Sequence, residues 1–116
     1  MFPVPDRIAL NDYNLDDVFS DLVHDADGRA LMSVKGKSQL LEVLLGPRYN
    51  AVVVFSPQPR ASANRAGTIP NFICFEPMAG ISDAMNLAYR GLYSELQMLP
   101  PGEIWQESFW VRPSGF

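Results

Sequence analysis

The hydrophobic residues of this chain recur mostly at every second position or in short continuous runs, as they do in β-strands. Ala30, Met32 and Val34 alternate along a half-buried strand. Residues 52–55 form a continuous β-branched and aromatic run, which predicts a strand buried on both faces. Strands are expected at 30–35, 41–45, 52–55, 72–76, 96–99 and 105–111. We therefore predict an all-β, sandwich-like fold.

Two segments carry a weak helical signal. Residues 15–27 have four apolar residues at helical spacing, but they are rich in Asp, which is a poor helix former. Residues 77–94 contain two glycines and a proline, and they fit either a long structured loop or a short helical turn at 84–89 with Ser82 as N-cap. Turns are expected at Asp27-Gly28 and at 35–37, and a surface loop at 56–71.

Composition and charge narrow the class of protein. The chain has 116 residues, 47% of them hydrophobic, which fits one globular domain over residues 1–116. Its 13 acids and 9 bases give a net charge of −4 without a basic patch, so we expect no nucleic-acid partner and no membrane partner. Without a bilayer-spanning run or a signal-peptide pattern, a cytoplasmic location is expected.

Residue patterns give little support to a metal or cofactor site. Cys74, the single cysteine, lies in an apolar run, which favours an inert core thiol over a nucleophile. Residues 25–28 partly imitate a calcium loop, but Val23 would take the first liganding position and the far end has no Glu. With no His/Cys cluster for zinc and no Gly-rich phosphate loop, we expect neither metal nor cofactor.

One carboxylate is distinguished by its position. The apolar run 72–75 leads directly to Glu76, and Pro77 predicts that the strand ends there, because proline cannot donate to a sheet ladder. A carboxylate at the end of a buried strand is costly unless it is paired, hydrogen-bonded or used, and it can serve in proton transfer. The alternative is a structural Glu that accepts hydrogen bonds from loop amides.

Three motifs occur in an order and at a spacing that point to one family. They are LDDVF at 15–19, CFEPMAGISDAMNL at 74–87 and PPGEIWQESFWV at 100–111. Together they resemble the aldose 1-epimerase (galactose mutarotase) family across essentially the whole chain, and the segment around Glu76 is the most specific. The resemblance implies a β-supersandwich fold and the interconversion of α and β anomers of free hexoses such as galactose or glucose.

The resemblance also implies roles for individual residues. Glu76 matches the family's catalytic base, which takes the proton from the anomeric hydroxyl. Asp16, in a D-x-x-F setting with Phe19, matches the Asp that hydrogen-bonds sugar hydroxyls. Asp17 follows at once, so the sequence leaves open which of the two carboxylates points toward the sugar.

The acid that mutarotation needs at the ring oxygen has no counterpart here. Family members are longer, and this chain resembles only their C-terminal part. The family's catalytic His, a second His and an Arg that hold the sugar lie in the part that would precede Met1. His24 matches none of them, and its setting is typical of a surface histidine at a turn. We therefore expect a fragment that is inactive alone.

Two hypotheses follow from these observations. The first is an aldose 1-epimerase, or its C-terminal portion, acting on free hexoses. The second is a non-catalytic β-sandwich module that binds carbohydrate or serves in interactions, and in either case Trp105 and Trp110 stack on a sugar or pack within the sheets. Truncation would leave strand edges bare, so we expect self-association or pairing with a missing N-terminal half.

Overall fold

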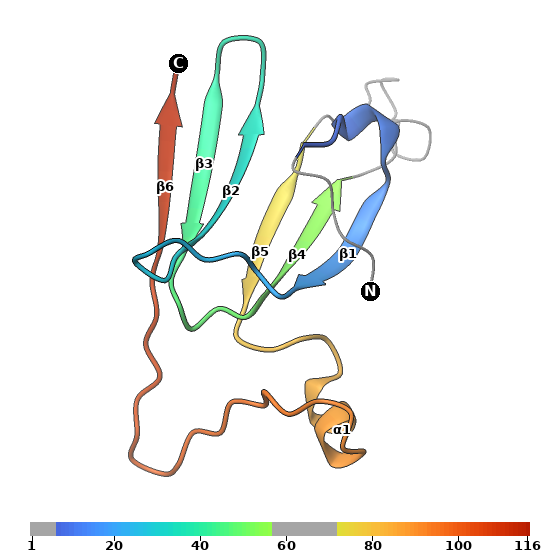
Figure 1. Ribbon diagram of the computed structural model, residues 1–116, viewed down its shortest axis with the longest axis vertical. Helices are drawn as coiled ribbons and strands as arrows, with labels where there is room; N and C mark the ends of the chain where they lie inside the picture. The colour runs from blue at the N-terminus through green and yellow to red at the C-terminus, as the bar shows by residue number, and fades with distance from the viewer. Residues whose placement is uncertain (1–6, 57–71) are drawn as a thin grey trace, which may run out of the picture.

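Six strands form two antiparallel three-stranded sheets (Figure 1). The structure is a computed structural model that describes residues 7–56 and 72–116. One sheet, of order β1-β4-β5, comprises β1 (Leu15–Ser20), β4 (Ala51–Ser56) and β5 (Cys74–Met78). The other, of order β2-β3-β6, comprises β2 (Ala30–Lys35), β3 (Leu40–Leu45) and β6 (Phe109–Ser114). The predicted all-β class is confirmed for the described residues.

The apolar core lies between the two sheets. Ala30, Val43 and Leu45 of the β2-β3-β6 sheet cluster with Val52 of β4, and Leu45 and Val52 are 0% and 2% exposed. Partly buried residues from both sheets pack around them. Leu45 ends β3, Ala30 begins β2 and Val52 lies near the start of β4, so the two sheets meet at these strand ends, next to the short β3–β4 connection.

The short connection between β3 and β4 is pinned by the segment just before β6. Gly46 N–H donates to the Ser108 carbonyl at 3.0 Å, and Arg48 N–H donates to Glu107 Oε2 at 2.8 Å. A Cβ atom at position 46 would lie 2.8 Å from the Ser108 carbonyl oxygen and would also collide with the Glu107 carboxylate. Glycine is therefore required here by the close approach of the two backbones.

Most of the strands expected from the sequence are confirmed, and the structure differs from the expectations in three segments. Residues 15–20 form β1 rather than a helical turn, because β4 supplies a partner along their full length. Residues 96–99 do not form a strand. The last strand runs over 109–114 and does not include Trp105. The expected loop at 56–71 lies outside the described residues, except for Ser56, which ends β4.

Two short helices complete the description. A 3₁₀-helix, η1 (Leu10–Asp12), precedes β1, and α1 (Ala84–Tyr89) follows β5. The helical alternative at 84–89 is thus confirmed, but the N-cap is Asp83 rather than Ser82, and it makes no side-chain cap hydrogen bond. No residue of α1 is buried, so packing within this chain contributes little to its stability.

Leu45→Ala tests whether the contact between the two sheets holds the fold together. Removing a fully buried leucine side chain is expected to lower the free energy of unfolding by about 2–5 kcal/mol. Leu31→Ala is the matched control in the neighbouring strand, since Leu31 is 54% exposed, and should change it by about 0.5 kcal/mol or less. Urea denaturation measures both, and equal losses would contradict this location of the core.

Candidate functional site

The strand register brings Asp16 and Glu76 to one face of the β1-β4-β5 sheet. Asp16 lies opposite Phe55, and Glu76 lies opposite Val53, on the two sides of β4. Directly paired residues share a face, as do residues two apart along a strand. Asp16, Val53, Phe55 and Glu76 therefore share one face, and it is the face turned away from Val52 and the core. We call this the outer face of the sheet.

The expected position of Glu76 at a strand end is wrong. Glu76 is the third residue of β5, which continues through Pro77 to Met78. β5 has β4 as its one neighbour among the described strands, and an edge strand accommodates a proline whose nitrogen points away from the ladder. The Glu76 side chain is exposed, so the cost of burying a carboxylate gives no reason to assign it a role.

The register also separates Asp16 from its neighbour. Asp17 lies opposite Val54, which packs against the core, so Asp17 is on the inner side of β1 and Asp16 is on the outer face with Glu76. Both aspartates are exposed, and the Asp17 carboxylate is 3.4 Å from the Asp16 backbone nitrogen. Of the two candidates, Asp16 is the one that shares the outer face with Glu76.

Between the two carboxylates the outer face is apolar. Val53 and Phe55 of β4 are half-buried, and the Phe55 ring lies 5.9 Å from that of Phe72. Cys74 lies opposite Phe55 on the same face and is also half-buried, so it is a free thiol of the outer face rather than part of the core between the sheets. An apolar floor flanked by two carboxylates offers both stacking surface and hydrogen-bond acceptors.

A hollow of about 480 Å³ with polar and apolar lining residues lies at another place in the fold, and no sequence motif pointed to it. It lies between the β3–β4 connection and residues 97–105, and Ala79 also borders it. Its lining residues are Pro47, Arg48, Asn50, Ala79, Gln97, Met98, Leu99 and Trp105. These residues are far apart in sequence, so only the folded chain brings them together.

Trp105 is the aromatic centre of this hollow. Its ring packs edge-on against Tyr49 at 5.9 Å, and the Arg48 guanidinium lies 5.3 Å from its centre. The indole N–H donates to Gln97 Oε1, and Gln97 Nε2 donates to the Arg48 carbonyl at 2.9 Å. Trp105 therefore fastens residues 97–105 onto the β3–β4 connection, and it lies outside both sheets.

Asn50 lies beside these contacts with one unpartnered atom. Its Nδ2 group donates to Tyr93 Oη at 3.1 Å and to Glu95 Oε2 at 3.2 Å, whereas its buried Oδ1 accepts no hydrogen bond. Turning the amide over would place oxygen against the Glu95 carboxylate, so this orientation is the better one. The hollow is thus held by polar contacts that are internal to the chain.

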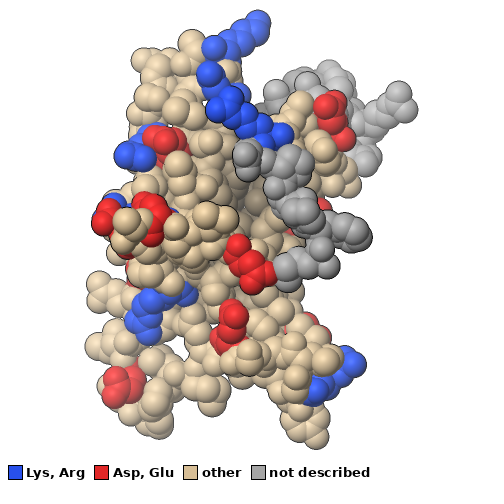
Figure 2. Space-filling model, viewed as in Figure 1, with Lys and Arg blue, Asp and Glu red and all other residues tan. Residues whose placement is uncertain are grey.

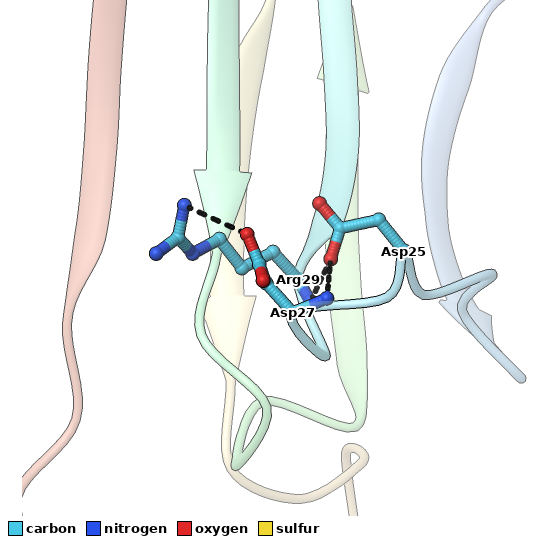
Figure 3. Close-up of polar contacts among 3 residues, drawn as sticks. All are labelled: Asp25, Asp27 and Arg29. Carbon is cyan, nitrogen blue, oxygen red and sulfur yellow. Dashed lines mark hydrogen bonds and ion pairs between the residues drawn. The ribbon is translucent and has the colours of Figure 1, made fainter.

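The acidic cluster before β2 has a structural explanation. Asp25 Oδ1 accepts backbone N–H groups of Asp27 at 2.9 Å and of Arg29 at 2.8 Å (Figure 3). Gly28 N–H donates to the Asp25 carbonyl. Asp27 forms a 3.8 Å ion pair with Arg29, whose guanidinium lies 4.7 Å from the Trp110 ring centre. The predicted Asp27-Gly28 turn is confirmed, and Asp25 Oδ1 is the side-chain acceptor that holds it.

The remaining features of the described residues concern charged side chains, possible metal ligands, membrane-spanning helices and His24. Acidic and basic side chains are scattered over the face shown in Figure 2. Within residues 7–56 and 72–116, no three His, Cys, Asp or Glu side chains are grouped as metal ligands. No helix in this part of the chain has the length and apolarity needed to cross a membrane. His24 forms an isolated bridge with Ala30 at the start of β2.

Asp25→Ala tests the turn assignment. Two backbone N–H groups lose their acceptor, so the free energy of unfolding should fall by about 1 kcal/mol, as for the loss of a helix cap. Asp27→Ala is the matched control, because it removes only an exposed ion pair and should cost less than about 0.5 kcal/mol. Urea denaturation compares the two, and a larger loss for Asp27→Ala would contradict the assignment.

Comparison with known proteins identified no relative of this chain. No family model, no curated protein sequence and no solved structure matches it.

Proposed function

We propose that this chain carries the base and a sugar-anchoring residue of an aldose 1-epimerase, with free hexoses as substrates. Glu76 takes the proton from the anomeric hydroxyl, and Asp16 accepts hydrogen bonds from other sugar hydroxyls. The observation that carries the proposal is the strand register, which turns both carboxylates to the outer face of one sheet.

The separation of the two carboxylates suits a small ligand lying across β4. Two strand spacings of about 4.8 Å and two residue rises of about 3.4 Å place the Cα atoms of Asp16 and Glu76 about 12 Å apart. Both side chains rise from the same face, so their carboxylates can reach the two ends of one hexose ring. Phe55 and Val53 lie between them as an apolar floor for the sugar's C–H surface.

The proposal requires an acid from outside these residues. As the ring opens, the base removes the O1 proton, the C1–O1 bond becomes a carbonyl, and the acid protonates O5 as the C1–O5 bond breaks. The single histidine, His24, bridges to β2 in the other sheet and is not placed on the outer face. A further polypeptide segment, which would also extend the two sheets into a β-supersandwich, is part of the proposal.

The exposure of Glu76 favours a second candidate function. A base works best where water is excluded, and the Glu76 side chain is open to solvent in this structure. A non-catalytic module that binds carbohydrate on the outer face would use the same Asp16 and Phe55 without needing an acid. The proposed location for either function is the cytoplasm, which accords with a single cysteine that can form no internal disulfide.

Asp16→Asn tests the sugar anchor in the isolated chain. D-galactose titrated into the ¹⁵N-labelled protein is expected to shift amide signals of β1, β4 and β5, and Asp16→Asn should weaken binding about tenfold through loss of a charged acceptor. Asp17→Asn is the matched control, because Asp17 has the same chemistry on the opposite side of the strand.

Signals that move mainly in the β2-β3-β6 sheet would place the sugar elsewhere. Equal effects of Asp16→Asn and Asp17→Asn would contradict the assignment of the outer face as the binding surface.

Glu76→Gln tests the base. Polarimetry of fresh α-D-glucose is carried out in imidazole buffer, whose imidazolium form supplies an external acid, and the rate in buffer alone is subtracted. The rate contributed by the chain should fall by about 10²-fold or more in Glu76→Gln, because a general base is removed while shape is retained. Glu103→Gln, an exposed glutamate in the turn that follows Pro100, is the control and should leave this rate unchanged.

A chain that binds galactose but adds nothing to the rate would favour the non-catalytic module. A chain-dependent rate that survives in Glu76→Gln would show that another residue is the base.

A further inference from the structure

β6 is an edge strand with a free side. It is the outermost strand of its sheet, and β3 is its one neighbour among the described strands (Figure 1). Phe109 and Val111 lie in the inward rows of Leu45 and Val43, yet they remain 53% and 52% exposed. The other sheet therefore leaves the inner side of β6 largely uncovered.

The hydrogen-bond pattern shows which β6 groups are free. Gly46 and Ser108 lie opposite each other in the β3–β6 register, and Gly46 N–H donates to the Ser108 carbonyl at 3.0 Å. They form a hydrogen-bonded pair, and such pairs alternate along an antiparallel ladder. The backbone groups of Trp110 therefore face β3, whereas those of Phe109, Val111 and Pro113 face outward.

The position of Pro113 agrees with this pattern. Proline has no N–H, so it causes no loss in the ladder with β3 only if its nitrogen points outward. The same alternation leaves Phe109 and Val111 with both an N–H and a carbonyl directed to the free side. The edge thus offers two complete pairing positions followed by one that lacks a donor.

The side chains of this edge give little protection against pairing. Edge strands are commonly protected by charged residues. Here Arg112 is the one charged residue of β6, and its Nε atom lies 3.4 Å from Glu42 Oε2 in its own sheet. The remaining exposed side chains are largely apolar, with Trp110 43% exposed on the outer side of this sheet.

We propose that β6 pairs in antiparallel fashion with β6 of a second copy of this chain, with the twofold axis at Trp110. In this register Phe109 of each copy lies opposite Val111 of the other, and the two pairs form four backbone hydrogen bonds. Arg112 lies opposite Ser108, so the Arg112 side chains of the two copies do not oppose each other. A shift by one pairing position would set Pro113 opposite Phe109 and leave the Phe109 carbonyl without a donor.

The proposed dimer is a continuous six-stranded sheet with Phe–Val cross-strand pairs on its inner side. The second copy fits because the β6 edge is complementary to itself in hydrogen bonding, side-chain size and charge. This inference is independent of the proposed sugar chemistry, since Asp16 and Glu76 lie on the other sheet.

Val111→Pro tests the interface because it removes one outward N–H per copy. Pro113 in the same strand already lacks this group, so the strand tolerates a proline at an outward position. Sedimentation velocity over a concentration series should show a monomer–dimer equilibrium for the wild type and a dissociation constant raised about tenfold or more for Val111→Pro. Ser33→Pro is the matched control. Gly36 N–H donates to the Gln39 carbonyl, and hydrogen-bonded pairs alternate along the β2–β3 ladder. The backbone groups of Ser33 therefore point outward from the opposite edge of this sheet.

A cysteine cross-link tests the register and does not depend on how proline is tolerated. In a Cys74→Ala background, Trp110→Cys should form an intermolecular disulfide, because a non-hydrogen-bonded antiparallel pair places Cα atoms about 4.5 Å apart. Arg112→Cys should not, since it faces Ser108 of the other copy. Circular dichroism checks that each variant retains its strands.

Three results would overturn the proposal. They are a wild-type monomer at every concentration, equal weakening by Val111→Pro and Ser33→Pro, and cross-linking that is stronger for Val111→Cys than for Trp110→Cys. The first result, together with protection of β6 amides when an upstream polypeptide is added, would assign the edge to a different chain segment.

Discussion

The packing of β3 against β4 is the contact on which the rest of this fold depends. Leu45 and Val52, the two largest fully buried side chains, come from the middle strands of opposite sheets and are separated by one short connection. Gly46 allows that connection to approach the backbone before β6, and Glu107 accepts the Arg48 N–H there. The same few residues therefore set the distance between the sheets and the start of the last strand.

This contact also decides which way the candidate site faces. Val52 points inward, so Val53 and Phe55 on the same strand point outward, because side chains alternate along β4. Glu76 and Asp16, which pair with them, point outward as well. Slipping β1 or β5 by one residue would carry Asp16 or Glu76 to the core side, where an unpaired carboxylate is costly. The alignment of the two acids is thus a consequence of core packing rather than of any direct contact between them.

The strand prediction from sequence succeeded where the apolar residues matched a strand. It failed where the same residues also matched a helix. Leu41, Val43 and Leu45 were expected to line one face of a strand, and they lie in β3. In β1, Leu15 and Phe19 fit both a helix and a strand, and pairing with β4 decides between them. Pro77 suggested a strand end because local reasoning cannot tell that β5 lies at an edge. For the site, the motifs selected Asp16 and Glu76, but only the register showed that they share a face.

The hollow and the free β6 edge could not be predicted, because both depend on contacts between distant segments. Residues 96–99 are apolar enough to suggest a strand, yet Gln97 anchors them by a side-chain bond to Arg48. Similarly, the sequence of β6 is typical of a half-buried strand, yet all of its residues are exposed. The other sheet does not cover β6, and the sequence of β6 itself cannot show this. A strand with an inward apolar row and no layer above it gains stability when another sheet continues beside it. Assembly through β6 would pair the free edge of its sheet with a second copy, while leaving the outer face of the other sheet free for a ligand.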